Sequence, residues 1–192
     1  TEFVAQYEAW AAKNGAPTNV GDKVWQLNYP RDNQRFYLHI MREFYRTFRE
    51  FNRRELGLKI PFNASNWAHW PWVLASQTEC DFMEAHQYYG GDRIGAGSGV
   101  GGLWVQHPPT LPNGPFSKMG QMFIAGQPSS VSEFGNNPPK TYRAAYYPGL
   151  AAVACLNEWD ILTGFAFTQG GSPAKNLSPY EWESDPATVA SY

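Results

Sequence analysis

The sequence predicts a mixed α/β fold built on a parallel sheet. Four short apolar segments have strand composition, and helical segments separate them along the chain. Such alternation is typical of βαβ units, whose crossovers are nearly always right-handed and whose strands are therefore parallel. A chain of 192 residues is long enough to bury a sizeable core.

Two helices are predicted before the first strand. Residues 1–14 place apolar side chains at helical spacing, and residues 33–56 carry a longer apolar stripe among arginines and glutamates. Gly57 follows the second helix, where a residue with a left-handed backbone commonly ends a helix. Shorter helices are predicted later in the chain, at residues 70–77, 116–123 and 141–157.

The four predicted strands are residues 58–63, 80–88, 128–135 and 161–168. An eight-stranded (β/α)8 barrel of the TIM type takes roughly 250 residues. Four strands preceded by two helices therefore predict the last four βα units of such a barrel. In this interpretation residues 1–57 precede strand five, residues 58–168 supply strands five to eight, and residues 169–192 form a tail.

The composition favours a carbohydrate ligand over a nucleic acid or a membrane. The net charge is −2, the aromatic content is 16%, and eight residues are Trp. A nearly neutral chain has no electrostatic attraction for nucleic acid or an anionic membrane. No run approaches the roughly 18 apolar residues of a membrane span. Cys80 and Cys155 either pair in an oxidising compartment or remain buried thiols.

Polar and aromatic side chains gather where each predicted strand ends. In a parallel barrel these ends meet at one mouth, where the chemistry of such barrels is found. Alternation along residues 80–88 predicts that Glu84, His86 and Tyr88 share one face. The predicted site consists of Asn66 and Trp67, His86 and Tyr88, Glu133, and Phe167 and Gln169.

Other motifs are interpreted as structural. Gly97, Gly99 and Gly102 match GxGxxG, but they lie in a long Gly/Pro-rich loop without the flanking strand and helix of a dinucleotide site. The four histidines lack metal-ligand spacing, so neither a metal nor another cofactor is expected. Ser130 and Ser132 are not in a GxSxG nucleophile elbow.

An ordered set of segments resembles clan A glycoside hydrolases, in particular the large bacterial cellulase/β-galactosidase-like enzymes. The resemblance covers about residues 33–190 and rests on NASNW, DFMEAHQYYG, VSEFG, and a YRAA helix that leads to WDILTGFAF. It implies a retaining glycosidase with Glu133 as the nucleophile on strand seven. It also implies that His86 and Tyr88 position that nucleophile, and that Asn66 and Trp67 open into the substrate cleft.

Retaining enzymes need a second carboxylic acid about 5–5.5 Å from the nucleophile. In this clan that acid follows an Asn at the end of strand four, and no Asn-Glu pair lies at a strand end here; Asn157-Glu158 falls at the end of a helix. We therefore expect the acid/base outside this chain, together with the first half of the barrel, and expect the chain alone to be inactive.

Two alternatives remain open. The first is a non-catalytic half-barrel that binds carbohydrate or pairs with a second copy of itself, because half a barrel exposes strand edges and apolar surface. The second is an open, doubly wound α/β domain with an unrelated small-molecule site. A secreted or periplasmic location is expected for an enzyme that degrades polysaccharides, although no signal sequence supports it.

Overall fold

The computed structural model describes residues 1–25, 31–66, 70–89, 93–94, 103–104, 109–110, 112, 114–136, 142–168, 182–183 and 185–191. The chain divides into two compact units. The first consists of Thr1–Ala64 and His69–Asp81, and the second of Ser65–Ala68 and Phe82–Tyr192. Within the part of the chain that the structure describes, none of the helices combines the length and the apolar character needed to cross a bilayer.

The first unit is helical. It contains α1 (Glu2–Asn14), a 3-10 helix (Gly21–Trp25), α2 (Arg31–Arg54), α3 (Pro71–Ser76) and a second 3-10 turn (Gln77–Glu79). The predicted helices are confirmed, and their ends follow the expected chemistry. The Thr1 hydroxyl accepts a hydrogen bond from the Val4 N–H, and Gly15 and Gly57 both adopt positive φ. The core of this unit is Tyr7, Ala11, Val24 and Phe36.

The prediction of a strand at residues 58–63 is wrong. Leu58 and Ile60 are exposed, and the Leu58 N–H donates to the Asn52 carbonyl of α2 rather than to a neighbouring strand. The Phe62 N–H donates to Asp81 Oδ2 at 2.8 Å, and the Phe62 carbonyl accepts from the Asp81 N–H. Pro61 supplies no N–H donor. Strand composition without an adjacent strand therefore gives only an irregular segment.

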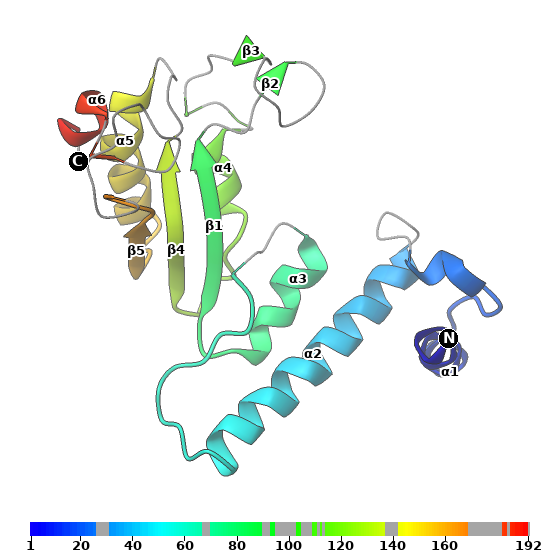
Figure 1. Cartoon of the computed structure of the whole chain (residues 1–192). Helices are drawn as coiled ribbons and strands as arrows, with labels where there is room; N and C mark the ends of the chain where they lie inside the picture. The colour runs from blue at the N-terminus through cyan, green and yellow to red at the C-terminus, as the bar shows by residue number, and fades with distance from the viewer. Residues whose placement is uncertain are drawn as a thin grey trace. The chain divides into compact units, whose positions relative to one another are not determined.

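The second unit is a mixed α/β structure around a small parallel sheet. Three strands pair in the order β1 (Met83–Tyr89), β4 (Ser129–Asn136) and β5 (Ile161–Gly164), and both pairs are parallel. The arrows of β1 and β4 run side by side in one direction in Figure 1. Three of the four predicted strands and the parallel arrangement are thus confirmed.

Helices complete the second unit. α4 (Pro115–Gly120) contacts β1, and α5 (Arg143–Leu156) lies between β4 and β5 in sequence. Both helices were predicted. The core contains Val131 and Phe134 of β4 packed with Tyr146, Tyr147 and Leu150 of α5 and with Trp182. The remaining elements, which the sequence did not predict, are β2 (Arg93–Ile94), β3 (Leu103–Trp104) and α6 (Pro186–Val189).

No disulfide joins the two cysteines: Cys80 is buried and Cys155 is exposed. Burial raises the pKa of the Cys80 thiol above its usual value, which disfavours its reactive thiolate.

Candidate functional site

The candidate site is built by the middle and carboxyl-terminal parts of β1 and β4. In the parallel register His86 is the partner of Glu133, and Tyr88 is the partner of Gly135. Three of the predicted site residues are therefore brought together by one strand pair. Carboxyl ends of parallel strands are where α/β proteins place their binding and catalytic groups.

The centre of the cluster is the Glu133 carboxylate. The Tyr88 hydroxyl donates to Glu133 Oε2 at 2.7 Å, and His86 Nδ1 lies 3.3 Å from the same oxygen. The Glu133 side chain is 33% exposed, whereas that of His86 is 6% exposed. A buried imidazole and a phenol thus hold a carboxylate that solvent can still reach.

A β-bulge lets a fourth residue join the cluster. The register passes from the pair Ala85 and Val131 directly to the pair His86 and Glu133, so Ser132 has no partner residue on β1. Its hydroxyl lies 2.8 Å from His86 Nε2, and its N–H donates to Glu84 Oε1 at 2.8 Å. Adjacent residues of a regular strand face opposite sides. The bulge instead allows Ser132 and Glu133 to contact opposite edges of one imidazole ring.

The sequence predicted part of this arrangement. Alternation placed Glu84, His86 and Tyr88 on one face of β1, and each of the three bonds to Ser132 or Glu133. The role of Ser132 was missed, because nothing in PSSVSEFG indicates where a bulge falls. The available signal was the spacing of Val131 and Phe134, both in the core although three residues apart.

The glycine of the SEFG segment, Gly135, lies where the backbone of another segment comes close. A Cβ atom at this position would lie 3.0 Å from the Phe165 carbonyl oxygen and 3.5 Å from Cδ1 of Tyr88. Only the distance to the Phe165 carbonyl is tight, since 3.5 Å to the Tyr88 ring is an ordinary van der Waals contact. The glycine therefore allows the chain that leaves β5 to approach the backbone of β4 closely.

Two other predicted residues, Asn66 and Phe167, are described, and neither has a recorded contact with the Glu133 cluster. Asn66 is exposed, and the Phe167 side chain is 58% exposed while its carbonyl accepts from the Glu183 N–H. Trp67 and Gln169 lie outside the described residues, as do Gly97, Gly99 and Gly102. The structure thus brings together Glu133, His86 and Tyr88. Asn66 follows the irregular segment 58–63, and Phe167 follows β5.

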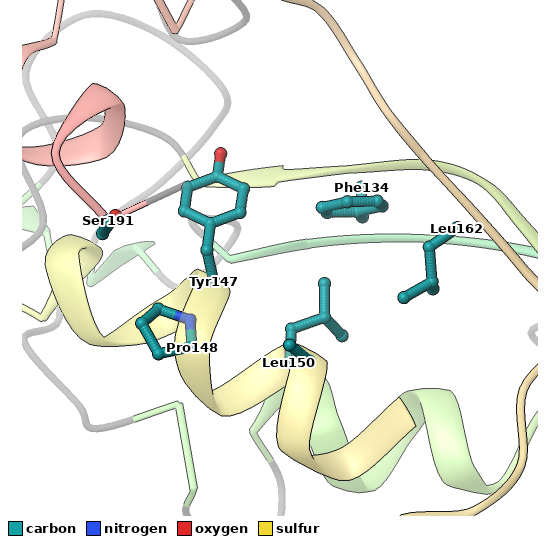
Figure 2. A pocket seen from close by; sticks show the side chains of 7 residues that line it. Phe134, Tyr147, Pro148, Leu150, Leu162 and Ser191 are labelled. Carbon is teal, nitrogen blue, oxygen red and sulfur yellow. The ribbon is translucent and has the colours of Figure 1, made fainter. Parts of the chain in front are cut away.

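A separate pocket lies against α5. Its volume is about 330 Å³, and it is lined by residues of β4, β5, α5 and the turn that follows α6, namely Phe134, Tyr147, Pro148, Leu150, Ala151, Leu162 and Ser191. Figure 2 shows Phe134 and Leu150 facing its interior. Phe134 follows Glu133 in a regular part of the strand, so the two side chains point to opposite faces of the sheet. Its lining contains no Asp, Glu, His, Lys or Arg, and none of the residues of the carboxylate cluster lines it.

The donor set does not suggest a metal. Among the residues that the structure describes, no group of three or more His, Cys, Asp or Glu side chains is arranged to hold an ion. A carboxylate held by a phenol and an imidazole and still partly exposed is suited to act as a nucleophile or to stabilise a cation.

Comparisons with known proteins found no relative. No family model matches the chain, and no curated protein or solved structure matches it.

Proposed function

We propose that this chain carries the nucleophile half of a retaining β-glycoside hydrolase that acts on oligo- or polysaccharide, with Glu133 as the nucleophile. The supporting observation is the convergence of Tyr88 and His86 on Glu133 Oε2 in the middle and carboxyl-terminal parts of two parallel strands. The resemblance of VSEFG and HQY to clan A glycosidases points to the same residues.

The Glu133 carboxylate would take part in both steps of the double displacement. The Tyr88 hydroxyl and His86 Nδ1 both contact Oε2. In the first step a carboxylate oxygen of Glu133 would attack the anomeric carbon, the glycosidic C–O bond would break, and the leaving oxygen would take a proton from the acid. In the second step the conjugate base of that acid would take a proton from water, the water oxygen would attack the anomeric carbon, and Glu133 would leave as a carboxylate. Donors that remain on Oε2 stabilise that leaving carboxylate.

Glu84 is not suited to the second catalytic role. It is 7% exposed, and its Oε1 accepts the Ser132 N–H, so it supports the bulge rather than facing a substrate. We therefore propose that the acid/base carboxyl comes from outside this chain.

We further propose that β1, β4 and β5 are three neighbouring strands of a (β/α)8 barrel. In support, each strand pairs with the next strand of its sheet in chain order, and helical segments separate them. β5 is an edge strand of the described sheet, and its Ile161 is 55% exposed. An exposed apolar edge needs a further strand or a partner. A strand from another segment, or from a second copy of the chain, would pair with the exposed edge of β5.

The test is covalent trapping in the natural protein that contains this chain. A 2-fluoro aryl β-glycoside slows hydrolysis of the intermediate, so the glycosyl group should accumulate as an ester on Glu133 and be found there by peptide mass spectrometry. Glu133→Gln should abolish labelling and lower kcat by roughly three orders of magnitude or more. Glu158→Gln, an exposed carboxylate at the end of α5, is the control and should behave as wild type. Normal hydrolysis by Glu133→Gln would refute the assignment.

A further inference from the structure

Ser132 occupies a position that no catalytic step described above uses. Its hydroxyl is 2.8 Å from His86 Nε2, on the side of the ring away from Glu133. Its backbone N–H is fixed by the buried Glu84 carboxylate on the neighbouring strand. The contact with Glu84 on β1 therefore fixes the backbone of Ser132 beside the His86 ring.

The contacts of His86 with Glu133 and with Ser132 indicate which ring nitrogen should carry the proton. A carboxylate is only an acceptor, so a favourable contact with Glu133 needs a proton on Nδ1. A neutral imidazole with a proton on Nδ1 has a lone pair on Nε2, and a serine hydroxyl can rotate to donate to it. The opposite tautomer would place the Nδ1 lone pair 3.3 Å from a carboxylate oxygen, which is repulsive.

We propose that Ser132 is a positioning residue that fixes His86 as the Nδ1–H tautomer, so that the ring donates to Glu133 Oε2. This inference deepens the proposed function and rests on it for its catalytic meaning. Three contacts are involved. The Glu84 carboxylate fixes the backbone of Ser132, the Ser132 hydroxyl contacts His86 Nε2, and His86 Nδ1 contacts Glu133.

Another use of the same atoms is less well supported. The order Ser132, His86, Glu133 matches the connectivity of a Ser–His–acid triad for acyl transfer. However, Ser132 lies within β4 rather than at a sharp turn, and its own N–H is bonded to Glu84 instead of being available to an oxyanion. These contacts suit a hydroxyl that orients the ring, not one that attacks a substrate.

The experiment reads the tautomer directly in the full chain. Two-dimensional ¹H–¹⁵N correlation spectra of the ¹⁵N-labelled imidazole distinguish a protonated from an unprotonated nitrogen at neutral pH. We expect His86 to have a protonated Nδ1 and an unprotonated Nε2. Ser132→Ala removes the hydroxyl at Nε2 while Glu133 still favours a proton on Nδ1, so the Nε2 resonance should shift toward the protonated form, and Ser132→Thr, which keeps the hydroxyl, should restore the wild-type signals. Ser130→Ala, a buried serine on the same strand, is the matched control.

Each outcome decides the proposal. Wild-type His86 protonated on Nε2, or spectra unchanged in Ser132→Ala, would overturn it. Because the spectra need no substrate, they are independent of whether Glu133 forms a glycosyl ester. In the active protein, kcat for an aryl β-glycoside should fall about five- to tenfold in Ser132→Ala, the equivalent of one lost hydrogen bond, and recover in Ser132→Thr. Loss of aryl-ester hydrolysis in Ser132→Ala without the Nε2 shift would instead establish the acyl-transfer role and refute ours.

Discussion

Asp81 shows how a carboxylate is used for structure in the first unit, in contrast to Glu133 in the second. It accepts from the guanidinium groups of Arg49 and Arg53 and from the Phe62 N–H. Partial burial would by itself raise the pKa of Asp81, but the Phe62 N–H and the two arginines outweigh it and hold that pKa below its usual value. This carboxylate therefore ties α2 to the irregular segment around Phe62.

Replacing Asp81 should destabilise the first unit in a pH-dependent way. Asp81→Asn removes the charge from three donors, and we expect a loss of about 1–3 kcal/mol near neutral pH. Because the folded pKa is depressed, the stabilisation is fully present above the unfolded value of about 4 and disappears as pH falls through the folded value. Urea unfolding at neutral pH and at an acidic pH below the unfolded value should therefore show that the difference between wild type and variant shrinks as the pH falls.

The exposed pair of Glu43 and Arg46 provides the control. Glu43→Gln should change the free energy of unfolding by less than about 0.5 kcal/mol at either pH, because a surface pair within one helix contributes little. A pH-independent difference between Asp81→Asn and wild type would contradict the role assigned to the charge.

At the scale of elements, β5 is held by an aromatic side chain as well as by its ladder. Gly164, its last residue, lies against the ring of Trp182, which also packs on Phe134 and Tyr147. The backbone N–H of Trp182 donates to the Ala166 carbonyl at 3.1 Å. Trp182 thus packs against the last residue of β5 and bonds to the backbone just beyond it.

A single methyl group at Gly164 should disturb this closure. Its Cβ would overlap the six-membered ring of Trp182, so either the ring or the strand must move. We expect Gly164→Ala to destabilise the second unit by about 1–3 kcal/mol, the usual cost of overpacking. Thermal unfolding and the near-ultraviolet dichroism of tryptophan would show the loss.

Gly120 offers a matched control at the end of α4. No atom lies within 4 Å of a Cβ built there, and its φ is not positive. Gly120→Ala should be neutral or slightly stabilising, because alanine restricts the unfolded chain. Equal effects of the two substitutions would argue against a specific contact at Gly164.

At the scale of the whole molecule, apolar side chains remain uncovered on both units. Phe44, Phe48 and Phe51 of α2 are 60%, 44% and 48% exposed, and Ile161 and Leu162 of the edge strand are 55% and 36% exposed. Clusters of this kind on a folded protein usually mark contacts with another surface. They are consistent with the proposed completion of the barrel.

The full chain should therefore self-associate when it is studied by itself. We expect sedimentation velocity to show a mass that rises with concentration, and Ile161→Lys to reduce that association, because a lysine on an edge strand opposes strand pairing. Leu156→Lys, a change of the same kind at an 82% exposed position on α5, should have little effect. A stable monomer at all concentrations would weigh against an incomplete barrel.

The local rules of sequence reasoning worked where the deciding interactions are local. The second helix ended before Gly57 as predicted, and alternation identified the shared face of His86 and Tyr88. The segment at 58–63 was mispredicted because a strand needs a neighbour, and composition cannot say whether one is present. Ser132 was missed for a related reason, since a bulge is a property of two strands in register.

The bulge at Ser132 changes which residues of β4 share one face of the sheet. Val131 and Phe134 both enter the apolar core although they are three positions apart, an odd spacing that a regular strand does not allow. Deleting one residue normally turns the rest of a strand inside out. Here, removing Ser132 would leave Val131, Glu133 and Phe134 in ordinary alternation. Insertion of this serine is therefore a step by which a plain strand could have gained a second polar contact to its histidine without disturbing the core.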